Sequence, residues 1–74
     1  MTMIMSEALA AKLRELGWNN FDRLTWGAVT DKGMGWVTIL SPYGNETTIF
    51  APFVPVPEGM RVAVGEQCAV VRQR

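Results

Sequence analysis

The chain has 74 residues, enough for one small domain built around a single hydrophobic core. Seven Lys and Arg residues balance seven Asp and Glu residues, so the net charge is zero. This balance argues against strong, salt-driven binding to a polyanion but leaves binding by aromatic stacking open. The chain has no histidine and one cysteine, Cys68, which excludes an intramolecular disulfide and the usual His/Cys metal sites.

No apolar run approaches the roughly 20 residues that span a bilayer, so we expect no membrane partner. The apolar start, Met1 to Met5, has no basic lead and passes directly into a charged segment. We therefore predict no signal peptide and a cytoplasmic protein. We find no paired acid and base, no nucleophile with a partner and no metal-ligand spacing, and so predict neither an enzyme nor a cofactor.

The first regular element that the sequence predicts is a helix over residues 6–16. Ser6 is a good N-cap, and Gly17 is a natural residue to end a helix. Three leucines follow one another at i, i+4 and i+7 and form one narrow stripe: Leu9, Leu13 and Leu16. Because so narrow a stripe does not hold a three-turn helix in water by itself, the helix must dock on another surface.

Three surfaces are open to this helix. It can cover a sheet face that carries Met34, Trp36 and Phe50, it can close an open end of a barrel, or it can pair with a second copy of the chain as a homodimer. We expect it to close the barrel end.

Short strands separated by Gly and Pro dominate the rest of the chain, as is typical of a small barrel. The predicted strands cover residues 24–29, 34–40, 46–51, 60–64 and 67–72. A turn is expected at Thr30 to Lys32, between the first two strands. Three prolines within residues 52–57 remove ladder donors, so that segment is predicted to be an edge or an extended crossover.

The run from Gly33 to Ile39 alternates with the period of a strand. One face, predicted to be buried, carries Gly33, Gly35, Val37 and Ile39. The other face carries Met34, Trp36 and Thr38. The remaining core is expected to include Ile49, Val62 and Val64.

The same run resembles the first signature of the cold-shock domain, an acidic residue followed by Lys-Gly-Phe-Gly-Phe-Ile-Thr. Here residues 31–38 read Asp-Lys-Gly-Met-Gly-Trp-Val-Thr. The later runs Ile49 to Phe53 and Glu58 to Val62 are similar to the family's second signature and to a late strand entry. Met34 and Pro52 depart from the family pattern, which has phenylalanine and histidine there.

The resemblance covers about residues 23–72 and implies an all-β fold, a small five-stranded OB-like cold-shock barrel. One N-terminal helix is added to it. The chain is therefore predicted to consist of a helix and connector over residues 1–22 and a barrel over residues 23–74. An SH3-like small barrel is the architectural alternative, because its strand lengths and turns give nearly the same pattern.

For function, the resemblance implies a module that binds single-stranded RNA or DNA. By alternation, Trp36 and Phe50 share one exposed face and form a stacking platform. The full set of candidate binding residues is Lys32, Met34, Trp36, Phe50, Phe53, Trp26 and Arg61, with Lys32 and Arg61 placed near phosphates. The alternative is a protein-interaction or assembly module whose platform is covered by its own helix or by another subunit.

Overall fold

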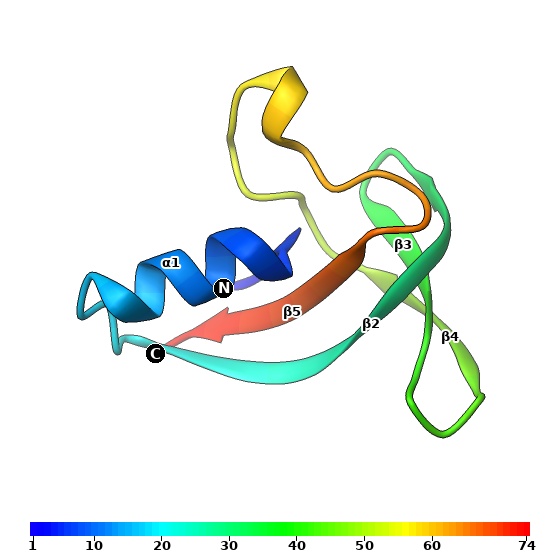
Figure 1. Ribbon diagram of the computed structural model, residues 1–74, viewed down its shortest axis with the longest axis horizontal. Helices are drawn as coiled ribbons and strands as arrows, with labels where there is room; N and C mark the ends of the chain where they lie inside the picture. Colours follow the sequence, from blue (N-terminus) through cyan, green and yellow to red (C-terminus); the bar gives the residue numbers. More distant parts are fainter.

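The computed structural model describes residues 1–74 and consists of five strands and one α-helix (Figure 1). The elements in chain order are β1 (Thr2–Ser6), α1 (Glu7–Glu15), β2 (Phe21–Gly33), β3 (Trp36–Leu40), β4 (Glu46–Phe50), the 3₁₀ turn η1 (Glu58–Met60) and β5 (Gln67–Gln73). The strands form one sheet in the order β1-β5-β2-β3-β4, and every neighbouring pair is antiparallel.

The topology joins a three-strand meander, β2-β3-β4, to a last strand that returns beside β2, which is a Greek-key arrangement. The sheet curls strongly, and the segment that follows β4 reaches the opposite edge, β1. There Ile4 N donates to Pro52 O at 2.8 Å, and Val54 N donates to Ile4 O at 2.8 Å. These two bonds bring the edges of the sheet together, but β1 and β4 do not pair and the sheet is not closed.

The expectation of a small β-rich fold with five strands and one helix is therefore confirmed, whereas a closed barrel is not formed. The predicted strand over residues 60–64 is wrong. Instead, the chain makes the 3₁₀ turn η1 and an irregular connection, in which Val62 is buried but Val64 is 56% exposed. Gly65, at φ 93°, turns this connection into β5, whose two neighbours in the sheet are β1 and β2.

Strand β1 was not anticipated from the sequence. Its five residues pair with β5 from Thr2↔Arg72 to Ser6↔Cys68, so the sheet crosses the boundary that was predicted between residues 22 and 23. The helix begins directly where this strand ends, because the Ser6 hydroxyl accepts a hydrogen bond from Leu9 N at 3.1 Å. The predicted helix is confirmed to within one residue at each end, and Gly17 follows it at φ 83°.

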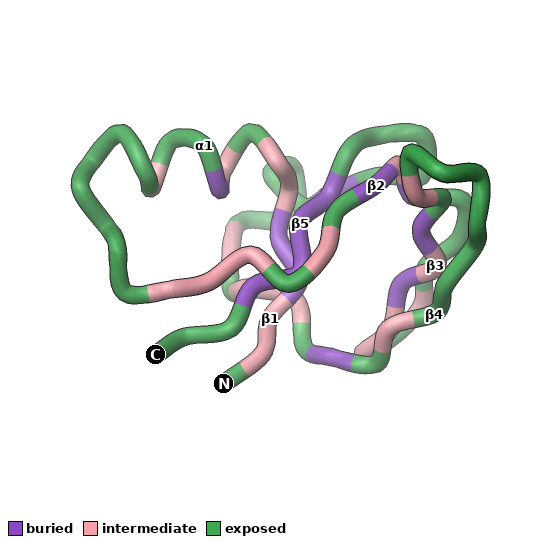
Figure 2. The backbone as a smooth tube through the Cα atoms, turned by 90° about the horizontal axis from the view of Figure 1, so that it is seen from below, coloured by how far each residue is buried: buried purple, intermediate pink, exposed green.

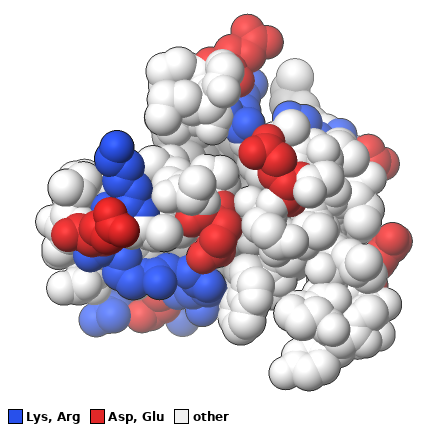
Figure 3. Space-filling model, in the orientation of Figure 1, with Lys and Arg blue, Asp and Glu red and all other residues white.

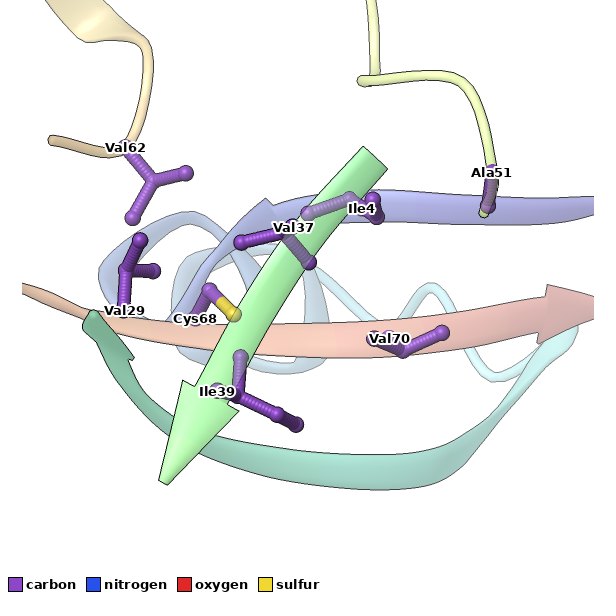
Figure 4. Packing of buried hydrophobic residues seen from close by; sticks show 8 residues of the cluster. All are labelled: Ile4, Val29, Val37, Ile39, Ala51, Val62, Cys68 and Val70. Carbon is purple, nitrogen blue, oxygen red and sulfur yellow. The ribbon is translucent and has the colours of Figure 1, made fainter. Parts of the chain in front are cut away.

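The hydrophobic core has two parts, one on each side of β5. Figure 2 shows buried positions along β5 and on the elements around it. The inner cluster consists of Ile4, Val29, Val37, Ile39, Ala51, Val62, Cys68 and Val70 (Figure 4). The outer cluster consists of Met5, Ala10, Ala69 and Val71, with Leu9 and Leu13 packed against it. The helix therefore covers the outward side of β5 and β1, and not a barrel end as predicted.

We expect Val37→Asp to unfold the domain. The Val37 side chain is fully buried, as predicted, and an unpaired carboxylate in so small a core costs more than the few kcal/mol by which such domains are stable. Thermal unfolding followed by circular dichroism tests this, with Thr47→Asp on the exposed part of β4 as the control. A cooperative melt of Val37→Asp near the wild-type temperature would contradict the assigned core.

Candidate functional site

The tip of the β2–β3 hairpin is a two-residue turn formed by Met34 and Gly35. Gly33 and Trp36 make the last pair of the hairpin, and Gly35 has a positive φ of 74° that favours glycine. The turn predicted at Thr30 to Lys32 is wrong, because β2 continues through those residues with a bulge between Val29 and Asp31. Met34 therefore stands at the tip of the hairpin, 99% exposed, and not in the strand beside Trp36.

This change of turn also moves Gly33 to the opposite face from the one predicted. Gly33 lies across from Trp36, and a Cβ atom at this position would collide with the Trp36 indole. The glycine thus lets the indole lie flat against the backbone of β2, which leaves Trp36 half-buried.

Trp36 and Phe50 lie directly opposite each other on β3 and β4, so they share one face of the sheet, as predicted. Phe50 is 78% exposed. Two residues along each strand, on the same face, the hydroxyls of Thr38 and Thr48 are 2.8 Å apart. Because α1 packs on the far part of the sheet, against β5 and β1, it does not cover this aromatic pair.

A cleft of about 700 Å³ opens at the hairpin tip. One wall is the hairpin tip, and the other is the proline-rich segment that follows β4. The residues that line the cleft are Lys32, Gly33, Met34, Gly35, Pro52, Phe53, Val54, Pro55 and Arg61. Four of the seven candidate residues, Lys32, Met34, Phe53 and Arg61, thus come together from three distant parts of the chain. Neither Trp36 nor Phe50 lines the cleft, but each lies within two residues of one that does, Gly35 or Pro52. The two strands are joined there by Ala51 N, which donates to Gly35 O at 3.1 Å.

The two charged side chains that line this cleft are both basic, although the chain as a whole is neutral. Five of the seven basic residues lie on α1 and the adjoining ends of β2 and β5, where acidic side chains are interspersed (Figure 3). The other two basic residues are Lys32 and Arg61, and no Asp or Glu lines the cleft with them. Lys32 Nζ donates to Val62 O at 2.8 Å, which holds the ammonium at the cleft and leaves two of its three N–H groups free.

Trp26 is the candidate residue that the structure separates from the others. It lies opposite Ala69, where β2 pairs with β5, and the Arg23 guanidinium stacks over its ring at 5.5 Å. Arg23 also pairs with Glu7 at the start of α1. The exposed indole therefore belongs to the surface near the helix, and its interaction with Arg23 was not detected from the sequence.

Cys68 is fully buried in the inner cluster. Burial, with a smaller contribution from the nearby Glu7 carboxylate, raises the pKa of its thiol to about 11. The thiol is therefore protonated near neutral pH and packs as a small hydrophobic side chain. No group of three or more His, Cys, Asp and Glu side chains is arranged to hold a metal ion, and no helix is long and apolar enough to cross a membrane.

Comparison of the chain with protein-family models, curated proteins and solved structures gives no match. The resemblance to the cold-shock domain therefore depends on the short motifs alone, and the function has to be argued from the geometry of the cleft and the aromatic pair.

The buried thiol predicts a specific dependence of stability on pH. The pKa of about 11 in the folded protein lies above the ordinary thiol value of 9.0. The buried neutral thiol therefore contributes its full share of folding stability below pH 9, and this contribution is lost as the pH rises to 11. The expected loss is roughly 2–3 kcal/mol of unfolding free energy, at about 1.4 kcal/mol per pKa unit. Urea denaturation of the wild type and of Cys68→Ala across this range measures it, since the variant lacks this contribution. Parallel pH profiles for the two proteins would contradict the prediction.

Proposed function

We propose that this protein binds single-stranded RNA or DNA, without catalysis and with little sequence preference. One observation carries the proposal. Residues that the sequence marked as candidates, from positions 32 to 61, converge on one cleft whose charged side chains are both basic, and an uncovered aromatic pair lies within two residues of its walls. Proteins that bind single-stranded nucleic acids with little sequence preference usually combine a basic groove with exposed aromatic rings.

The two parts of the site have different roles in this proposal. Phe50, the more exposed ring, stacks on a base, and Trp36 extends the surface beside it. Arg61 makes no ion pair, so its guanidinium is available for a phosphate oxygen. Lys32, held on the carbonyl of the neighbouring Val62, presents its free N–H groups to the same cleft. Stacking contributes about 1–3 kcal/mol per base, whereas the phosphate contacts mainly position the strand.

The observed strands depart from the cold-shock pattern. In the sheet, β5 lies between β1 and β2, and the fourth strand that the cold-shock pattern requires is replaced by η1 and a loop. We therefore base the proposed function on the side chains at the cleft and not on membership of a nucleic-acid-binding family.

A protein-interaction module is the second candidate function, and Met34 is the observation that favours it. A fully exposed thioether at a hairpin tip offers no flat surface for a base, but it adapts well to an apolar pocket on a partner protein. The neutral net charge of the chain also favours a protein partner over a polyanion.

Substitution of the aromatic pair tests the stacking role. Trp36→Ala and Phe50→Ala should each weaken the binding of a short labelled oligothymidine by about 1–3 kcal/mol, because each removes a stacking surface. Fluorescence anisotropy of the oligonucleotide measures the affinity, and circular dichroism confirms that the variants fold. Tyr43→Ala is the matched control, since Tyr43 is an equally exposed aromatic residue (89%) on the β3–β4 loop.

Equal affinities for the wild type and for both aromatic variants would contradict stacking on this face. A flat titration of the wild type with both DNA and RNA oligonucleotides would contradict the proposed function and favour the protein-interaction candidate.

The cleft also predicts a shallow dependence of affinity on salt. Two basic residues support one or two phosphate contacts, so the slope of log K against log salt should be no steeper than about −1.5. Arg61→Gln should reduce the slope by about 0.7, the contribution of one contact with a single strand. Lys12→Gln on α1 is the control and should leave it unchanged. A steep slope that Arg61→Gln does not alter would place the phosphate contacts elsewhere.

A further inference from the structure

Strand β4 presents the free edge of the sheet. It pairs with β3 on one side, and no backbone hydrogen bond other than those to β3 reaches residues 46–50. An unpaired edge offers a row of N–H and C=O groups that a further strand can pair with.

The register identifies the outward-facing groups. Ala51 N donates to Gly35 O, on the β3 side, so alternation directs the backbone groups of Thr47 and Ile49 toward β3 as well. The backbone groups of Glu46, Thr48 and Phe50 consequently point to the free edge. The close approach of the Thr38 and Thr48 hydroxyls agrees with this assignment, since side chains lie closer in pairs that share no ladder hydrogen bonds.

The opposite edge of the sheet, β1, is protected. Both outward groups of Ile4, at the centre of β1, are hydrogen-bonded to the segment that follows β4, through Pro52 O and Val54 N. Nothing comparable protects β4, whose five residues contain no proline, no lysine and no bulge, the usual features that block edge pairing.

We propose that β4 pairs antiparallel with β4 of a second copy, so that this protein is a homodimer with one continuous sheet. A two-fold axis at Thr48 places Thr48 opposite Thr48 of the second copy and Glu46 opposite its Phe50. All three outward-facing residues of each strand then exchange both of their backbone hydrogen bonds.

A second copy is the occupant that this edge fits, because one antiparallel pair centred on Thr48 satisfies the outward backbone groups of Glu46, Thr48 and Phe50 in both copies at once. A register shifted toward Pro52 would form fewer backbone hydrogen bonds between the two strands, since proline has no N–H and the Pro52 carbonyl is already bonded to Ile4. In the proposed register Glu46 faces an aromatic side chain and not the second Glu46. The neutral net charge also leaves no general repulsion between copies.

The dimer has a consequence for the surface described above. With the two-fold axis perpendicular to the sheet, both Trp36–Phe50 pairs lie on the same face and on either side of the seam. The dimer requires only the backbone of β4. The proposed dimer therefore does not depend on the proposed binding of nucleic acid.

Proline substitution at the two edges tests the proposal. Sedimentation velocity over a concentration series should show the wild type passing from monomer to dimer, whereas Thr48→Pro should stay monomeric because it removes one outward N–H from the seam. Thr2→Pro is the matched control, since it removes an outward N–H from the protected edge, and it should dimerise like the wild type. A wild type that is monomeric throughout, open-ended larger oligomers, or equal effects of the two substitutions would overturn the proposal.

Cysteine cross-linking tests the register without relying on the proline variants. Thr48 residues that face each other across an antiparallel pair are about 5.5 Å apart at Cα, within disulfide range. Thr48→Cys should therefore form a covalent dimer when oxidised by diamide, and Thr47→Cys should not. Wild-type protein gives the background, because Cys68 is buried. Equal cross-linking at the two positions, or none at position 48, would overturn the assigned seam.

Discussion

The burial of β5 on both of its faces is the constraint on which the rest of the structure depends. Residues 68–71 are four consecutive buried positions that alternate between the inner and outer clusters. A strand of this kind needs an apolar layer on each side, and a 74-residue chain has little material with which to supply two. The curled sheet provides the inner layer. The helix provides the outer one, and Ser6 couples the helix directly to β1 without an intervening loop.

Strand β2 connects this central packing to the candidate site and sets the position of the site. Its thirteen residues pair with β5 over the first part and with β3 over the second, and a bulge interrupts each pairing. Such bulges bend a strand and increase its twist. Gly27, between the two bulges, lies against the carbonyl of Leu40 where no Cβ atom would fit. This bent strand carries Lys32 and the hairpin tip to the proline-rich segment, so the cleft depends on the curvature of the sheet.

Much of the local structure follows from sequence pattern because the relevant forces act over a few residues. The N-cap at Ser6, the glycine at position 17 and the leucine spacing are enough to define the helix. Alternation is enough to bury Val37 and Ile39 and to place Trp36 and Phe50 on one outward face. The site could therefore be predicted in part, since its aromatic pair is a local consequence of two short strands.

Local pattern was thus enough to specify the helix, most of the strands and most of the side chains that turn inward, Val64 and Gly33 being exceptions. Residues 2–6 form a strand through long-range pairing, because their partner, β5, lies more than sixty residues away in the chain. The tertiary structure also decided that the hairpin turns at Met34-Gly35, although residues 30–32 have turn propensity as well. The grouping of Lys32, Phe53 and Arg61 at one cleft also depends on contacts between segments that are distant in the chain. Local propensity sets the conformation of each segment, but pairing and packing between distant segments set which segments become neighbours.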